Sequence, residues 1–323
     1  MFDSVGSRIS IQASRNQVLR LQGVDSDSVN WGWLSDKERF IFEAFSHPDR
    51  LHTPLIAKNK DTNSQQEKAS WPEALKVAAA SLSETSSDRI AVIGGSRLTN
   101  ESQYAWTKVA KGILGTDHVD AQIGDGLPAE VLLGLPRATI NQACRPGGTI
   151  VLLGPDLKEE LGSLYLRIRH AVVHDGATLI ELTPASTGLT PYATHSLRIR
   201  PGETLEVIQA MFEDGGVAPI GGVDPEEAKT VGALLQNTDD VTVLLGRSSL
   251  AEAEGPVVDA ALALYDRLAD VKFLSLLRRG NVHGAFDMGM APNLLPGRVT
   301  FTANQTAIHE VWPTTPAHKG NTT

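Results

Sequence analysis

The chain has 323 residues, 41% of them hydrophobic, and a formal net charge of −9. This length can bury one large core or two modest ones. The net negative charge argues against a nucleic-acid partner, and the sequence has no stripe of basic residues interleaved with aromatic ones. The sequence contains no apolar run of about 18 residues, the length needed to cross a membrane. We also expect no signal peptide. The single cysteine, Cys144, excludes an internal disulfide and fits a reducing compartment.

The N-terminal segment predicts a small β-hairpin subdomain. Apolar and polar residues alternate over residues 8–22 around a polar turn, so we expect a hairpin with one buried face. A short helix over residues 36–45 should follow, anchored by Phe40 and Phe45. Residues 58–68 are rich in Lys, Asn, Asp and Gln, which is typical of a surface linker.

From residue 70 onward the pattern changes to alternating helices and strands. Ser70 and Glu73 form a capping-box motif that opens a helix with apolar residues at a 3.6-residue period. The run Ile90–Ile93 predicts a strand buried on both faces. It is followed by a helix that begins near Asn100 and has Trp106 and Ile113 on its apolar face.

The same unit recurs toward the C-terminus. Apolar strands are predicted over 149–153, 178–182, 241–245 and 271–276, and a capping box at Ser249 predicts the start of the helix after the third. Strands that alternate with amphipathic helices indicate an α/β fold with a doubly wound, mainly parallel sheet.

Three strand-to-helix turns, after Ile93, Leu153 and Leu245, should open on a common edge of one sheet, where α/β proteins bind ligands. The first is the best small-molecule candidate, because backbone amides at a helix start, with an arginine, can hold a phosphate. It has the glycines of neither a dinucleotide fingerprint nor a P-loop. A plain structural turn is therefore the favoured interpretation. The candidate binding residues are Gly94, Gly95, Arg97 and Asn100.

Other catalytic patterns are weak. There is no Gly-x-Ser-x-Gly elbow of a serine hydrolase and no zincin motif. Cys144 follows apolar residues at helical spacing, which favours a core residue over a nucleophile. The carboxylates are interpreted as solvated groups on helix surfaces and caps.

Two short motifs carry a resemblance to a known family. Residues 2–7, Phe-Asp-Ser-Val-Gly-Ser, and residues 31–40, Trp-Gly-Trp-Leu-Ser-Asp-Lys-Glu-Arg-Phe, resemble the iron–sulfur ligand segments of molybdopterin oxidoreductases. In that family cysteines stand where this chain has Asp3, Ser7 and Ser35, and a fourth ligand would fall before Met1. A [4Fe–4S] cluster needs four thiolates, so we expect no cluster and no metal site here.

Further motifs extend the resemblance over nearly the whole chain; they lie at residues 94–101, 114–122, 188–193 and 283–298. Together they resemble the G subunit of NADH-quinone oxidoreductase, respiratory complex I, of the actinobacterial type. The resemblance implies a component of the cytoplasmic peripheral arm, with other complex I subunits as partners. Membrane association would then occur only through the complex, at the inner face of the plasma membrane.

The resemblance also implies 4Fe–4S clusters in the family and molybdopterin guanine dinucleotide in its ancestral relatives, but no cofactor in this chain. We expect a remnant of the cluster subdomain over 1–55, a polar linker over 56–69 and an α/β domain over 70–323. The leading hypothesis is a structural, redox-inactive part of the G subunit. The alternatives are a molybdopterin-dependent oxidoreductase, with the pterin held near Gly94, Gly124 and Gly246, or a free-standing pterin- or nucleotide-binding module. The chain is expected to be a fragment, a split-gene product or a truncated form, without the family's ferredoxin-like part.

Overall fold

The fold is taken from a computed structural model that describes residues 4–57, 65–124, 126–213 and 219–300, together with 310, 312, 314–316 and 318–321. It divides into two compact units, each built from two separate stretches of chain. Unit 1 is Met1–Arg39 with Gly124–Val282, and unit 2 is Phe40–Ile123 with His283–Thr323.

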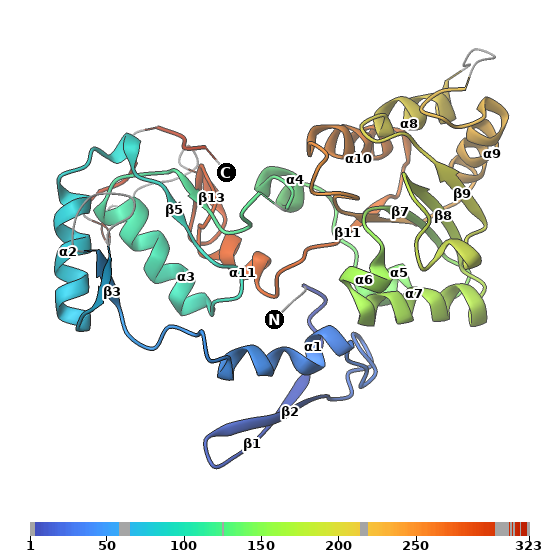
Figure 1. Cartoon of the computed structure of the whole chain (residues 1–323). Helices are drawn as coiled ribbons and strands as arrows, with labels where there is room; N and C mark the ends of the chain where they lie inside the picture. Colours follow the sequence, from blue (N-terminus) through green and yellow to red (C-terminus); the bar gives the residue numbers. More distant parts are fainter. Residues whose placement is uncertain are drawn as a thin grey trace. The chain divides into compact units, whose positions relative to one another are not determined.

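A five-stranded parallel sheet forms the centre of unit 1, with the strand order β11-β10-β7-β8-β9 (Figure 1). All five residues of β7 are buried, as the apolar run predicts for a central strand. The predicted strands are confirmed; their bounds are β7 (Thr149–Leu153), β8 (Thr178–Thr183), β10 (Val241–Leu245) and β11 (Lys272–Ser275), and β9 (His195–Arg198) is an additional edge strand.

Helices cover both faces of this sheet (Figure 1). Ile150 and Leu152 of β7 belong to a buried apolar cluster with residues of α5, α6 and α7, and successive strand residues point to opposite faces. The bounds on this side are α5 (Ile140–Ala143), α6 (Leu157–Glu160) and α7 (Gly162–His174). The other side has α8 (Thr204–Phe212), α9 (Pro225–Gln236) and α10 (Gly255–Arg267), and α4 (Ala129–Gly134) precedes α5. The predicted doubly wound fold is therefore confirmed.

The predicted start of the helix after β10 is wrong. Ser249 accepts a hydrogen bond from the amide of Ala251, 3.1 Å away, but this closes only a local turn. Helix α10 begins at Gly255, with Pro256 in its first turn. Proline is favoured there because its missing N–H would have no partner inside the helix.

The N-terminal hairpin is confirmed as an antiparallel pair, β1 (Ile9–Ser14) and β2 (Gln17–Gly23). Arg15 and Asn16 both have positive φ, as a two-residue hairpin turn requires. The predicted buried face is wrong for most of its length. Leu21 is buried, whereas Leu19 and Ile11, the ladder partner of Leu21, are more than half exposed.

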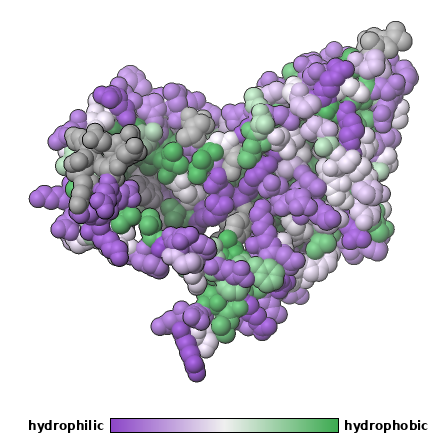
Figure 2. Space-filling model, viewed as in Figure 1, coloured by the Kyte–Doolittle hydropathy of each residue, from purple (hydrophilic) through white to green (hydrophobic). Residues whose placement is uncertain are grey.

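The predicted helix over 36–45 forms as α1 (Asp36–Phe40) and a 3₁₀ turn, η1 (Ile41–Ser46). Its predicted anchors are wrong, since Phe40 is 52% exposed and Phe45 is 41% exposed. Figure 2 shows apolar surface in this part of the chain. The apolar positions here were predictable, but their burial was not.

Unit 2 contains a short parallel pair of strands, β5 (Val92–Ile93) and β6 (Val119–Asp120). The prediction of a strand buried on both faces is wrong, since Val92 is 9% exposed but Ile93 is 56% exposed. Further elements are α3 (Asn100–Thr107), a π-helical continuation η3 (Lys108–Ile113), α11 (Val282–Asp287), β12 (Leu294–Leu295) and β13 (Val299–Thr300).

Helix α3 begins at Asn100 as predicted, capped by Thr99. The face that it buries differs from the prediction. Trp106 is 47% exposed and Ile113 is 59% exposed, while polar Gln103 and Thr107 are fully buried. Apolar periodicity predicted the buried face only in part. Ala110 of the same predicted face is fully buried, but polar Gln103 is buried as well, because its side chain donates to the Gly95 carbonyl at 2.7 Å.

Helix α2 (Trp71–Ser83) has the predicted capping box. The Ser70 hydroxyl lies 2.7 Å from the Glu73 carboxylate, and the Ser70 amide also donates to it at 2.9 Å. No residue of this helix is buried. The ends of the predicted linker pair as two antiparallel strands, β3 (Leu55–Ala57) and β4 (Gln66–Lys68), while residues 58–64 lie outside the described residues.

The two units interleave along the chain, whereas the sequence suggested three consecutive segments, 1–55, 56–69 and 70–323. That division stays a prediction about the origin of the segments. Within the described residues no helix is both long enough and apolar enough to span a bilayer.

Candidate functional site

The carboxyl edge of the unit 1 sheet is the first place where a ligand could bind. The strand order reverses between β7 and β10, which is the position of ligand crevices in doubly wound sheets. Gly154 and Gly246 follow these strands at the same edge, with the Gly246 amide 2.8 Å from the Leu153 carbonyl. The prediction of a common edge is confirmed for these two turns. It is wrong for the turn after Ile93, which belongs to the separate β5–β6 sheet of unit 2.

This crevice is filled by the chain itself. A Cβ atom at Gly154 would lie 2.4 Å from Leu276, so the glycine is required by packing. The guanidinium of Arg247 donates to the carbonyls of Gly124, Leu250 and Glu252, which leaves a cavity of about 10 Å³. That is space for one water.

The predicted binding residues Gly94, Gly95, Arg97 and Asn100 do lie together, at the turn between β5 and α3 of unit 2. A Cβ at Gly94 would come within 2.3 Å of the Met290 side chain, so this glycine serves close packing. Arg97 and Asn100 are exposed. Whether the four residues bind a ligand stays a prediction.

Ser7 and Ser35, two positions where the resemblance places cysteines, lie in unit 1. The Ser35 hydroxyl is 3.0 Å from the Glu38 carboxylate and accepts from the Glu38 amide at 3.3 Å, so it caps the start of α1. The buried Ser7 hydroxyl has no hydrogen-bond partner among the described residues. Asp3 lies outside the described residues.

This donor set does not fit an iron–sulfur cluster, which requires thiolates. The single thiol, Cys144, follows α5 and packs against the apolar core of unit 1. Burial raises the pKa of the Cys144 thiol to about 11, which disfavours the thiolate. The prediction that Cys144 is a core residue agrees with this environment. Among the described residues, no three His, Cys, Asp or Glu side chains are grouped to hold a metal.

A buried arginine ties the cluster-like segment to the α/β sheet of unit 1. Arg167 of α7 is 3% exposed and donates to the carbonyls of Val29, at 2.7 Å, and Asp27, at 3.1 Å. Its guanidinium also donates to the Asn141 side chain, at 2.8 Å, and lies 4.1 Å from the centre of a Trp31 ring. The segment that binds a cluster in the family thus has a structural attachment here that needs no metal.

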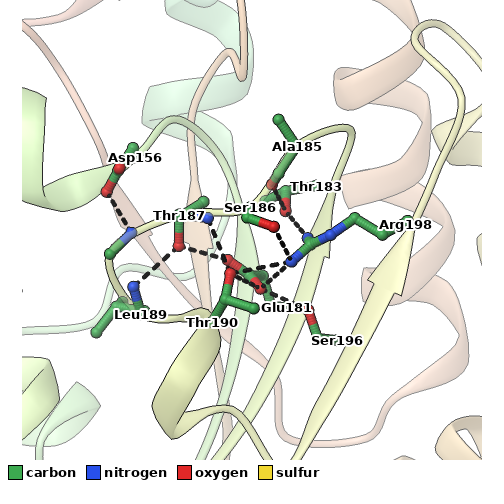
Figure 3. A network of polar contacts seen from close by, with 11 residues as sticks. Asp156, Glu181, Thr183, Ala185, Ser186, Thr187, Leu189, Thr190, Ser196 and Arg198 are labelled. Atoms are coloured by element: carbon green, nitrogen blue, oxygen red, sulfur yellow. Dashed lines mark hydrogen bonds and ion pairs between the residues drawn. The ribbon is translucent and has the colours of Figure 1, made fainter.

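A second polar network surrounds Glu181 at the carboxyl end of β8 (Figure 3). This carboxylate is fully buried and accepts from the hydroxyls of Thr187, at 2.5 Å, Thr190, at 2.8 Å, and Ser196, at 2.6 Å. Arg198 of β9 completes the set at 3.2 Å. The connection from β8 to β9 has no α-helix, and these bonds hold its loop in place.

Unit 2 has a comparable buried charge pair. Lys111 of η3 and Asp117 are both fully buried, with nitrogen and oxygen 2.8 Å apart. Lys111 also donates to the carbonyls of Ala291 and Leu294, and Asp117 accepts from the amide of Gly320 at 2.8 Å. The pair therefore joins η3 to the C-terminal stretch of unit 2.

The sequence interpretation of the carboxylates as solvated is wrong for Glu181 and Asp117. The signal for Glu181 was a charged residue between Ile180 and Leu182 in an otherwise apolar strand. Sequence reasoning also missed that His170 and His174 are four residues apart in one helix.

Comparison with known proteins shows the family to which the chain belongs. The model of the molybdopterin oxidoreductases matches residues 50–214, more than half of the chain. The chain belongs to the molybdopterin oxidoreductase family. A second family model, the NADH-ubiquinone oxidoreductase NDSU1/NuoG-like 4Fe-4S domain, matches residues 1–43 of the chain. This range includes Ser7 and Ser35.

Individual relatives agree with the family. The NADH-quinone oxidoreductase G subunit of Streptomyces coelicolor is 30% identical over 88% of this chain and 34% of its own length. NADPH-Fe(3+) oxidoreductase subunit alpha of Geobacter sulfurreducens is 26% identical over 96% of this chain and 41% of its own length. The predicted resemblance to the G subunit is thereby confirmed. The chain spans less than half of these relatives.

Among solved structures, acetylene hydratase from Pelobacter acetylenicus matches with a TM-score of 0.58 and 14% identity, over 82% of this chain and 42% of the hydratase. At this identity the similarity shows the fold alone.

Proposed function

We propose that this chain is a structural, redox-inactive part of the peripheral-arm G subunit of an NADH-quinone oxidoreductase. In the assembled complex it would support the transfer of electrons from NADH to quinone, which the other subunits and clusters perform. The proposal includes a position on the cytoplasmic side, held to the membrane through the complex. Its support is the similarity to the G subunit over most of the chain.

One observation carries the redox-inactive part of the proposal. Ser35 stands where the family has a ligand cysteine, and its hydroxyl is engaged by Glu38 as a helix cap. The segment is also attached to α7 by hydrogen bonds from Arg167. A scaffold role explains why the framework of the cluster site is kept without its ligands.

Anaerobic reconstitution with iron and sulfide tests the missing redox centre. We expect no stable visible absorbance and no stoichiometric iron after gel filtration, because hydroxyls are poor ligands for iron–sulfur clusters. A stable brown protein with about four irons per chain would contradict the proposal. Stoichiometric molybdenum in the purified protein would favour the alternative, a molybdopterin-dependent oxidoreductase.

Affinity purification of the tagged full chain from its source cells tests the partner. We expect NADH-quinone oxidoreductase subunits to co-purify at constant stoichiometry. As a matched pair, Arg167→Met should reduce this recovery if the attached N-terminal segment contributes to docking, whereas the exposed Arg97→Met serves as a control. Recovery of the chain alone in gentle detergent would contradict membership of the complex.

A further inference from the structure

The last turns of α7 carry two imidazoles on one helix face. His170 and His174 are separated by four residues, about one helical turn, and their ring centres lie 4.8 Å apart. The Asp175 carboxylate follows directly, with an oxygen 3.8 Å from Nε2 of His170. This region is distinct from Ser7 and Ser35 and from the crevice at the sheet edge.

Both imidazole side chains are accessible to solvent. The His170 side chain is 39% exposed and His174 is exposed. No hydrogen bond engages either ring within the part of the chain that the structure describes. A partly exposed histidine without such a bond can offer a neutral imidazole nitrogen to a metal ion.

The geometry points to a surface site for a borderline divalent metal ion, Zn²⁺, Ni²⁺ or Cu²⁺, chelated by His170 and His174. Imidazole pairs at i and i+4 on a helix are a recurring zinc-ligand arrangement, and imidazole suits these ions better than Mg²⁺ or Ca²⁺. No third ligand side chain is grouped with the pair among the described residues, so water would complete the coordination.

The charges around the two histidines determine how tightly the site is expected to bind a metal ion. Asp175 favours a cation, whereas two arginines of the same helix oppose it. Arg167 lies over the Trp31 ring, and Arg169 lies over the Tyr192 ring, 5.0 Å from its centre. Trp31 also contacts His170 edge to face, at 5.0 Å between ring centres, and therefore provides an optical reporter beside the site.

Calorimetric titration of the full chain with zinc chloride at about pH 8, where an ordinary imidazole is neutral, tests the proposal. We expect one saturable site per chain, and His170→Ala and His174→Ala should each weaken it about tenfold or more, because chelation by two ligands is lost. Cu²⁺ should quench tryptophan fluorescence, and Trp31→Phe should remove most of that quenching.

His47→Ala is the matched control, since His47 also has a carboxylate neighbour, Asp49, at 3.7 Å but no second imidazole beside it among the described residues. Circular dichroism of each variant establishes that the fold is kept. No saturable binding up to about 1 mM zinc would overturn the proposal. Binding that His47→Ala weakens as much as His170→Ala does would overturn it as well.

Discussion

The carboxylate of Glu181 and the guanidinium of Arg198 meet across the β8–β9 edge of the sheet, 3.2 Å apart, with the carboxylate fully buried and the arginine partly exposed. Glu181 accepts from three hydroxyls as well, so its charge is compensated from several directions. The connection between β8 and β9 lacks the α-helix that usually joins parallel strands, and the hydrogen bonds of Glu181 hold its loop in place instead. The stability of this part of unit 1 should therefore depend on one charged residue.

Glu181→Ala is expected to destabilise the protein by about 3–5 kcal/mol, since it leaves Arg198 and three hydroxyls without their acceptor. Arg198→Ala should cost less, because the hydroxyls still satisfy the carboxylate. Urea denaturation followed by circular dichroism measures both. Glu159→Ala, at an exposed position of α6, is the control and should stay within about 0.5 kcal/mol. Equal effects at Glu181 and Glu159 would contradict the structural role of the network.

Leu152→Ala should destabilise the protein by about 2–5 kcal/mol, through lost burial and the cavity that remains in β7. Leu262→Ala in α10 removes the same atoms from a side chain that is 41% exposed, and should cost clearly less. Paired urea midpoints give the comparison. A small effect at Leu152 would mean that the sheet centre repacks.

Ser7 and Ser35, which stand where the family has cysteines, should respond differently to alanine. Ser35→Ala should cost about 1 kcal/mol, because Ser35 caps α1. Ser7→Ala should be nearly neutral or slightly stabilising, since it removes a buried hydroxyl that has no partner among the described residues. Thermal denaturation of the two variants tests the contrast. A larger loss at Ser7 would indicate a bound group that both hydroxyls contact.

Because of Lys111, we expect the free energy of unfolding of the protein to rise with pH. Burial lowers its pKa to about 8 from the ordinary 10.5, despite the opposing charge of Asp117. Between about pH 8 and 10.5 the unfolded chain therefore binds more protons at this site, and stability rises with pH. The free energy of unfolding, taken as wild type minus Lys111→Met, should increase by about 1–2 kcal/mol between pH 7.5 and 9.5. Lys76→Met, at an exposed position of α2, should show no such trend.

Arg167→Ala should cost about 1.5–3 kcal/mol, because the hydrogen bonds of a buried, charged guanidinium to two carbonyls and the Asn141 side chain are lost. Trp31 fluorescence should shift to the red as its ring loses the guanidinium and becomes hydrated. Arg97→Ala, at an exposed turn, should leave both observables nearly unchanged. An unaltered emission spectrum in Arg167→Ala would show that the segment does not depend on this contact.

The sequence predicted the central strands well because a parallel sheet buried on both faces needs continuous apolar runs, as in β7. It predicted caps such as Ser70 because capping depends on neighbouring residues only. Burial was predicted poorly where partners are distant in sequence. Ile93 and Trp106 have apolar patterns but remain exposed, whereas Lys111 is buried through contacts almost 200 positions away.

The candidate site shows the same limit. The sequence located Gly94 and Gly154 at strand-to-helix turns, but only the fold shows that a leucine and an arginine of the chain fill the second of these. The resemblance to the family motifs indicated that serines stand at positions 7 and 35 where the family has cysteines. It did not predict that Ser35 caps α1, because the cap depends on where that helix begins.

The interleaving of the two units has a consequence for the order in which the protein can form. The hairpin and the segment around Trp31 are synthesised well before the α7 side chain that attaches them, Arg167, and most of unit 2 is made in between. Unit 2 in turn is completed only when Gly320 reaches Asp117. Apolar residues such as Val119, which packs in one cluster with Ala285 and Met290, therefore gain part of their core only late in synthesis. We expect slow, chaperone-dependent maturation in which their transient exposure favours aggregation at high expression.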